Sequence, residues 1–289
     1  MKNLFLRFPI ASRFILAVVL SISALILSGI IETASLKKYF PFTGTILFIL
    51  VNWILYKTEN KTLKEIGLNL TFRNLTFLLL GLLIGVVALG IQTYFRTLYT
   101  GEQWNISTVI NTTILWKQLY YILPMAAVQE LMFRGYCFKK TIEVSNVVIA
   151  NIIFAVLFML VHILDNDVLQ NTPQLIFLAI SIPVGHLLFA TALLKSRTLF
   201  FPIGLHWGNN WASSHLIGQN NTDKVIFYTT HQQALNSWTQ FFIIMLIFIV
   251  FFLLVTFLIW KWDSFTFFKT RMNGSTSANT RLDLLPGDE

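Results

Sequence analysis

Long apolar segments alternate with short polar segments along almost the whole chain. An α-helix needs about 20 apolar residues to cross the hydrocarbon core of a bilayer. Eight segments of roughly that length are present, and the loops between them hold most of the charged residues. The segments are Phe14–Ile31, Tyr39–Tyr56, Leu75–Phe95, Ile114–Tyr136, Val147–Leu164, Gln174–Leu194, Leu199–Ile217 and Trp238–Trp260. This pattern predicts an all-α membrane protein, a bundle of about eight transmembrane helices.

The composition agrees with this prediction. Hydrophobic residues make up 55% of the 289-residue chain and charged residues only 12%, which is typical of a membrane protein with several spans. The single cysteine, Cys137, excludes an internal disulfide framework and a cysteine-rich metal site. The net charge is +8, but the basic residues lie in loops between apolar segments. We therefore expect a lipid bilayer as partner and no nucleic acid.

The distribution of lysine and arginine predicts how the bundle is oriented. With eight spans, the polar segments on the side of both termini hold 15 of the 21 basic residues. The other side holds Lys37, Lys38, Arg96, Lys117 and Lys224, and the remaining residue, Arg134, lies inside an apolar segment. Basic loops accumulate on the cytoplasmic side of a membrane. We therefore expect a multi-pass protein of the plasma membrane with both termini in the cytoplasm.

The same pattern divides the chain into four regions. Residues 1–113 hold the first three predicted helices, and residues 114–218 hold helices four to seven. Residues 219–260 form a loop and the eighth helix, and residues 261–289 form a polar tail that we expect to be flexible. The third helix is rich in small residues, which permit close approach of another helix.

Polar residues within the apolar segments of residues 114–218 gather in three short groups. These groups are Gln129–Arg134, Phe158–His162 and His206–Asn210. Among the 13 acidic residues, Glu130 alone lies well inside a predicted span. Charged side chains at membrane depth are costly and usually functional, and residues four apart share one face of a helix. If the three faces converge, they form an intramembrane site with a carboxylate, an arginine, two imidazoles and a carboxamide.

Each group also has a simpler interpretation when taken alone. Glu130 and Arg134 could form a structural ion pair, and His162 and His206 could be hydrogen-bonding residues between helices. Two histidines and one carboxylate are compatible with zinc without being specific for it. A transporter or channel is a further alternative, because a polar cluster can be a permeation site. The chain has no inverted repeat to support that alternative.

Together the three groups resemble the CAAX-processing and bacteriocin-processing (CPBP, or Abi) family of intramembrane proteases. That family carries Glu-Glu-x-x-x-Arg, Phe-x-x-x-His and His-x-x-x-Asn or Asp, in this order, on separate helices. The resemblance covers about Ile114 to Gly218, and Lys64–Leu68 also resembles the segment that precedes the family's third helix. It implies an eight-helix intramembrane endopeptidase, of glutamic or metallo type, that hydrolyses a peptide or protein substrate at the membrane. A divalent metal such as zinc is a cofactor that the resemblance leaves open, with His162 and His206 as its ligands.

The resemblance also implies roles for individual residues. Gln129 and His162 occupy the positions that activate water, and His206 and Asn210 occupy those that stabilise the oxyanion. The expected catalytic set is Gln129, Glu130, His162, His206 and Asn210, with Arg134 and Phe158 as structural residues.

The chain departs from the family pattern at Gln129, where the family has its first glutamate. A carboxamide can hydrogen-bond a water but cannot accept a proton at neutral pH. Three interpretations follow: a degenerate protein that binds without cleaving, catalysis through His162 as the sole base, or a helix distortion that brings Glu130 into the pocket. In the first case the protein would act in peptide binding, bacteriocin immunity or scaffolding.

Overall fold

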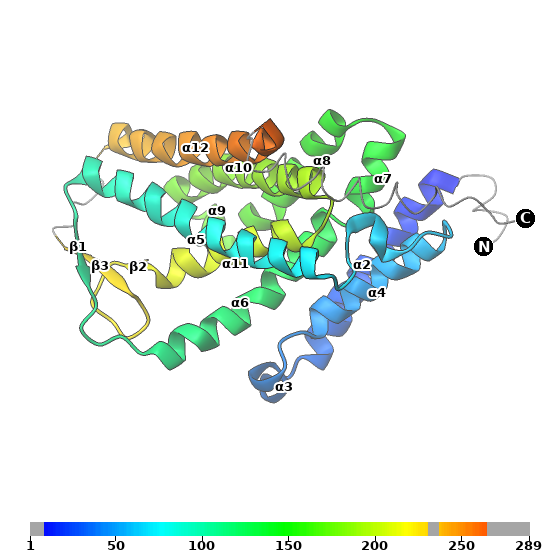
Figure 1. Cartoon of the computed structure of the whole chain (residues 1–289), viewed down its shortest axis with the longest axis horizontal. Coiled ribbons are helices and arrows are strands. Elements are labelled where there is room, and N and C mark those ends of the chain that lie inside the picture. The colour runs from blue at the N-terminus through cyan, green and yellow to red at the C-terminus, as the bar shows by residue number, and fades with distance from the viewer. Residues whose placement is uncertain (1–8, 231–236, 265–289) are drawn as a thin grey trace, which may run out of the picture.

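The computed structural model describes residues 9–230 and 237–264, and these are mostly helical (Figure 1). Eight helices coincide with the eight predicted segments: α2 (Pro9–Ile31), α4 (Thr43–Lys57), α5 (Phe72–Thr100), α6 (Thr112–Phe133), α8 (Val147–Ile163), α10 (Thr172–Ser196), α11 (Phe200–His215) and α12 (Trp238–Trp260). Shorter elements lie between and after them: α3 (Ala34–Tyr39), η1 (Leu63–Ile66), α7 (Tyr136–Val144), α9 (Asn166–Leu169) and η2 (Trp262–Ser264). The all-α architecture is confirmed.

Membrane-spanning character differs among these helices. Four of them, α2, α5, α10 and α12, are long and apolar enough to cross a bilayer. The helices α4 and α8 are apolar but shorter, with 15 and 17 residues, while α6 and α11 carry most of the polar groups singled out above. The chain is therefore a multi-pass membrane protein by helix length and composition, and the count of eight spans stays a prediction.

A small sheet at one end of the bundle was not predicted. It consists of β1 (Gln103–Ile106), β2 (Ile217–Gly218) and β3 (Phe227–Thr230), in the order β1-β3-β2. β1 runs antiparallel to β3 and β2 runs parallel to it. Figure 1 shows the sheet beyond the end of α11, on the side of the molecule opposite α7. We call this side the sheet end.

The opposite side of the bundle is held together by polar contacts between helix ends. The Leu199 N–H donates to the Ile66 carbonyl at 2.9 Å, and Arg73 Nη2 donates to the Ser196 carbonyl at 2.7 Å. Lys195 Nζ lies 2.7 Å from Asp263 Oδ2. These contacts join η1 and the start of α5 to the end of α10 and the start of α11, and the end of α10 to η2. We call this side, which holds η1, α7 and the junction of α10 with α11, the basic end.

Glu59 is the centre of a charged network at the basic end. Its carboxylate accepts hydrogen bonds from the Tyr136 hydroxyl and from Lys140, and it pairs with Arg13 and Lys61. Burial opposes the charged carboxylate, but the hydrogen bonds from Tyr136 and Lys140 outweigh it and lower the pKa of Glu59 to about 2. The carboxylate is therefore ionised at neutral pH and ties together the ends of α2, α4 and α7.

The helices α5 and α11 approach each other at backbone distance through glycines. Gly81 and Gly85 on α5 face Gly204 and Gly208 on α11, both pairs spaced as Gly-x-x-x-Gly. A Cβ atom at Gly204 would lie 2.1 Å from the backbone oxygen of Leu78, and one at Gly85 would lie 2.4 Å from the backbone oxygen of Leu205. Such small residues let membrane helices pack closely. The prediction that the third apolar segment packs closely against a neighbour is thus confirmed.

Gly204→Ala should destabilise the protein by about 1–3 kcal/mol, the usual cost of overpacking. The added methyl would meet backbone atoms of α5, which cannot rotate away as a side chain can. The midpoint of thermal unfolding in detergent measures the effect. Gly29→Ala on α2 is the matched control, because nothing lies within 4 Å of its Cβ position. Equal midpoints for the two variants would contradict backbone contact between α5 and α11.

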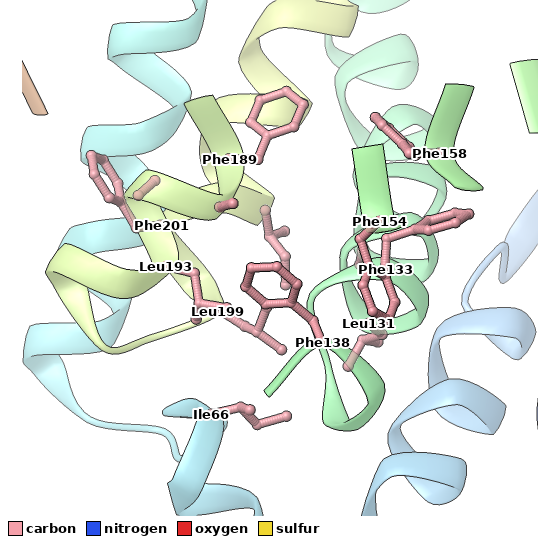
Figure 2. Close-up of a cluster of buried hydrophobic side chains, with 14 of the residues drawn as sticks. Ile66, Leu131, Phe133, Phe138, Phe154, Phe158, Phe189, Leu193, Leu199 and Phe201 are labelled. Atoms are coloured by element: carbon pink, nitrogen blue, oxygen red, sulfur yellow. The ribbon is translucent and has the colours of Figure 1, made fainter. Parts of the chain in front are cut away.

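Aromatic and aliphatic side chains fill the interior between these helices. Figure 2 shows buried side chains from α6, α7, α8, α10 and α11, with contributions from η1 and Leu199, gathered between these helices. Its labelled residues are Ile66, Leu131, Phe133, Phe138, Phe154, Phe158, Phe189, Leu193, Leu199 and Phe201. Phe138 is fully buried at the centre of this view. This core fixes the helices that carry the polar groups described next.

Candidate active site

The three polar groups converge around the ring of Phe158 on α8. The Arg134 guanidinium carbon lies 4.2 Å from the centre of this ring. The imidazole centres of His162 and His206 lie 4.6 Å and 6.1 Å from it. A cation over an aromatic face and rings in edge contact are both favourable arrangements. The Phe158 ring therefore contacts a polar side chain from each of the three groups.

A break between α6 and α7 places the Arg134 guanidinium against the face of the Phe158 ring. The α-helix predicted to reach Tyr136 ends at Phe133, and α7 begins at Tyr136. Asn52 on α4 holds the break: its Oδ1 accepts from the Tyr136 N–H at 2.7 Å and its Nδ2 donates to the Leu131 carbonyl at 3.2 Å. A Cβ at Gly135 would lie 2.2 Å from Asn52 Oδ1. The sharp turn after Arg134 therefore requires a glycine.

Glu130 is completely buried between Arg134 and His206. Its Oε1 accepts from Arg134 Nη1 at 3.1 Å and lies 2.8 Å from His206 Nδ1, and both charged side chains have no exposed surface. The expected pairing of Glu130 with Arg134 is present, and His206 is an additional partner on α11. Glu130 thus connects two of the three groups directly.

A cavity of about 800 Å³ lies in front of these residues. Gln129, His162, His206 and Asn210 all contribute to its lining, whereas Glu130 does not. The helix α6 remains an α-helix through Phe133, so the geometry gives no support to a distortion that brings Glu130 into the pocket. Of the five residues expected to be catalytic, four therefore line one cavity, and the fifth, Glu130, contacts His206 from outside it.

In both histidines Nδ1 is hydrogen-bonded, and Nε2 is the ring nitrogen that remains for reaction. His162 Nδ1 lies 2.7 Å from the Phe158 carbonyl oxygen, which can only accept a hydrogen bond. His206 Nδ1 is held in the same way by the Glu130 carboxylate. In a neutral imidazole whose Nδ1 carries the hydrogen, Nε2 is an acceptor. Both side chains can therefore take a proton at Nε2, and His206 can donate from Nε2 only as an imidazolium.

Gln129 has an unused acceptor at the cavity. Its Oε1 atom is buried and has no hydrogen-bond partner among the described residues. A buried carbonyl oxygen without a partner costs free energy, so a donor from a ligand or a water would be favourable there. Gln129 therefore lines the cavity while its Oε1 atom is shielded, and a water or a peptide N–H reaches that atom only after the carboxamide rotates.

Comparison with known proteins agrees with the motifs. Residues 111–212 match the family model described as type II CAAX prenyl endopeptidase Rce1-like. This region is Rce1-like. It contains all three polar groups, from Gln129 to Asn210, and the resemblance to the CAAX-type intramembrane protease family is confirmed. No curated protein and no solved structure matches the chain.

The Rce1-like region does not provide a typical set of ligands for catalytic zinc, which has three protein ligands. No group of three His, Cys, Asp or Glu side chains within residues 9–230 and 237–264 is placed to hold a metal. His162 and His206 could offer two nitrogens, but Glu130 is occupied by Arg134 and Gln129 offers only a carboxamide. The donor set therefore does not fit catalytic zinc.

Several residues of the site were not singled out from the sequence. The Phe189 ring stacks on His206 with centres 4.8 Å apart and an angle of 14° between the planes. Gln92, Arg96 and Asn209 line the cavity. Their types are ordinary near helix ends and in apolar helices, so only the arrangement of the helices shows their place.

The remaining histidines within the described residues lie apart from the cavity. His186 is buried against Phe138, with ring centres 5.8 Å apart, and does not contribute to the lining. His215 is held by the Lys224 carbonyl, 2.9 Å from its Nδ1. His231 lies outside the described residues. The choice of His162 and His206 over the other histidines therefore agrees with the geometry.

Proposed function

We propose that this protein is an intramembrane endopeptidase of the CAAX-processing and bacteriocin-processing type. One observation carries the proposal: two imidazoles, each with Nδ1 already bonded and Nε2 available, line one 800 Å³ cavity together with Gln129 and Asn210. A cavity of this size is large enough for several residues of a peptide. The match of residues 111–212 to an endopeptidase family supports the same function.

Hydrolysis would begin with a water in the cavity that hydrogen-bonds the Gln129 carboxamide. His162 Nε2 takes a proton from that water as its oxygen attacks the carbonyl carbon of the scissile peptide bond. The carbonyl oxygen becomes an oxyanion, which accepts hydrogen bonds from the Asn210 carboxamide and from His206 when its Nε2 is protonated. Each such donor contributes about 3 kcal/mol in other enzymes. The proton on His162 then passes to the departing nitrogen as the C–N bond breaks, which yields an amine and a carboxylic acid that loses its proton to solvent.

Glu130 would support this chemistry through His206. The carboxylate fixes the orientation of the imidazole, with Glu130 Oε1 2.8 Å from His206 Nδ1. Arg134 compensates the same carboxylate from the other side. Glu130 is therefore a positioning residue, and the charge that the family pattern places at position 129 is missing from the cavity wall.

The uncharged Gln129 favours a second candidate function. Without a carboxylate base, the protein would bind a peptide in the cavity without cleaving it. It would then act as a peptide-binding, bacteriocin-immunity or scaffold protein of the membrane. The buried acceptor of Gln129 supports binding as well as it supports water activation.

Gln129→Glu should increase peptide cleavage by about tenfold or more, because a positioned general base contributes about 10²–10⁴-fold. The measurement compares the cleavage rates of a peptide library by the purified wild-type and variant proteins. Ser213→Glu, which adds a carboxylate elsewhere in the same cavity, is the matched control and should give no gain.

The outcomes of this experiment separate the two functions. Cleavage by the wild type supports the endopeptidase. Cleavage by Gln129→Glu alone, with equal peptide binding by both proteins, supports the binding function. A gain with Ser213→Glu as large as with Gln129→Glu would contradict a specific role for position 129.

A further inference from the structure

The cavity extends from the site toward one end of the bundle only. On α5 its lining comes from the last turns, Leu89 to Arg96, and on α11 it runs from His206 to Ser214. Leu216, directly after α11, also lines it. The cavity continues along β2 and reaches Thr229 of β3. None of its lining residues belongs to η1 or α7 at the basic end. The cavity therefore opens at the sheet end, the side on which Figure 1 shows the strands.

The basic residues are divided between the same two ends. Within the described residues, the basic end carries Arg13, Lys57, Lys61, Lys64, Arg73, Lys139, Lys140, Lys195, Arg197 and Lys261. The sheet end and the helix ends and loops on its side carry half as many, namely Lys37 and Lys38 in α3, Arg96 near the end of α5, Lys117 near the start of α6, and Lys224. Since basic segments stay on the cytoplasmic side, the basic end faces the cytoplasm. The mouth of the cavity then faces away from it.

The two walls of the cavity differ in polarity. The wall formed by α10 and α12 is apolar, with Phe177, Leu178, Ile182, Ile244, Phe248 and Phe252. The wall formed by α5 and α11 is polar, with Gln92, Thr93, Arg96, Asn209 and Ser213. A ligand that matches both walls has apolar side chains on one side and polar groups on the other. An extended peptide with alternating apolar and polar residues has this arrangement, because its side chains point alternately to opposite faces.

The strand β2 adds a backbone contact at the mouth. It is the last strand of the order β1-β3-β2, so it pairs with another described strand along one edge only. Both of its residues, Ile217 and Gly218, line the cavity. A strand edge offers backbone N–H and C=O groups to an extended peptide without regard to its sequence.

We infer that the cavity is loaded from the extracytoplasmic side and takes an extended segment of an exported peptide with alternating apolar and polar residues. This inference rests on the proposed function for what happens to the peptide, but the side of entry and the kind of ligand are independent of cleavage. Arg96 at the mouth, whose Nη2 pairs with Glu102 Oε2 at 2.8 Å, would be the first charged group that such a peptide meets.

Cysteine accessibility in intact cells tests the side of entry. In a Cys137→Ser background, which removes the only native cysteine, single cysteines are introduced as Ser213→Cys in the cavity and Lys64→Cys at the basic end. Both side chains are exposed. A membrane-impermeant maleimide should label Ser213→Cys in intact cells and Lys64→Cys only after permeabilisation. Labelling of Lys64→Cys in intact cells, or of Ser213→Cys only after permeabilisation, would overturn the inference.

A protection experiment tests the kind of ligand. A short peptide of alternating leucine and serine, added outside the cells, should remove most of the labelling of Ser213→Cys. A peptide of the same composition with its leucines grouped together should protect less. Val109→Cys, an exposed site in the loop between β1 and α6, controls for nonspecific effects and should be labelled equally with and without peptide. Absence of protection at Ser213→Cys would overturn the ligand class, whether or not the protein cleaves peptides.

Discussion

Replacing His162 with glutamine should reduce peptide cleavage by a factor of about 10²–10⁴, the usual contribution of a general base. Glutamine can still donate to the Phe158 carbonyl, which now lies 2.7 Å from His162 Nδ1, and can still hydrogen-bond a water. It cannot accept the proton that water must lose when it attacks. With Gln129 uncharged, the described residues offer no other base on that side of the cavity. Initial rates of cleavage of one peptide by purified proteins measure the effect.

His215→Gln is the matched control for that experiment. Its Nδ1 also bonds a backbone carbonyl, that of Lys224 at 2.9 Å, but its side chain does not line the cavity. This variant should lose a similar local hydrogen bond and keep its cleavage rate within a few-fold of the wild type. Equal losses of cleavage in both variants would mean that His162 acts through stability and not as a base. Retained cleavage in His162→Gln would contradict the proposed mechanism.

Arg134→Met should destabilise the folded protein by about 3–5 kcal/mol, the cost of removing one partner of a buried ion pair. Glu130 has no exposed surface and would lose its only arginine. The substitution also removes the guanidinium from the face of Phe158, 4.2 Å from the ring centre, and from Phe189 at 5.3 Å. Methionine fills a similar volume, so the loss of charge and not a cavity dominates. The midpoint of thermal unfolding in detergent reports the effect.

Two comparisons isolate the buried charge in that prediction. The double variant Glu130→Gln with Arg134→Met removes both charges and should recover part of the lost stability. Lys195→Met breaks the pair with Asp263, whose side chain is 50% exposed, and should change stability by no more than about 1 kcal/mol. If the double variant is less stable than Arg134→Met alone, the cost of Arg134→Met does not come from an unpaired charge on Glu130.

Much of the fold follows from the length of the apolar segments, because each predicted segment is long enough to form several helical turns. The helices appear at all eight places within a few residues of the predicted bounds. Boundaries shift where a polar contact, and not hydrophobicity, ends the helix. At α6 the hydrogen bonds of Asn52 stop the helix before Tyr136, and no local pattern in α6 shows that an asparagine on α4 would do so.

The contacts within single helices of the candidate site were predictable, but the contacts between helices were not. Spacing of four residues places Glu130 with Arg134 and Phe158 with His162, since both are contacts within one helix. The bond between Glu130 and His206 joins residues far apart in the chain, and it depends on how α6 and α11 are packed. The same applies to the sheet, whose strand β2 has only two residues and therefore leaves no alternating pattern to detect.

The glycine contacts between α5 and α11 also have a mechanical meaning. Where two helices touch through their backbones, a change of side-chain rotamer cannot make room for them to shift. The helices α5 and α11 therefore behave as one rigid pair, and α11 carries His206 and Asn210. The opposite wall is joined by side chains, with the rings of Phe177 on α10 and Phe248 on α12 packed 5.3 Å apart between centres. Widening of the cavity to admit or release a peptide therefore falls to the α10–α12 wall, while His206 and Asn210 keep their positions on α11.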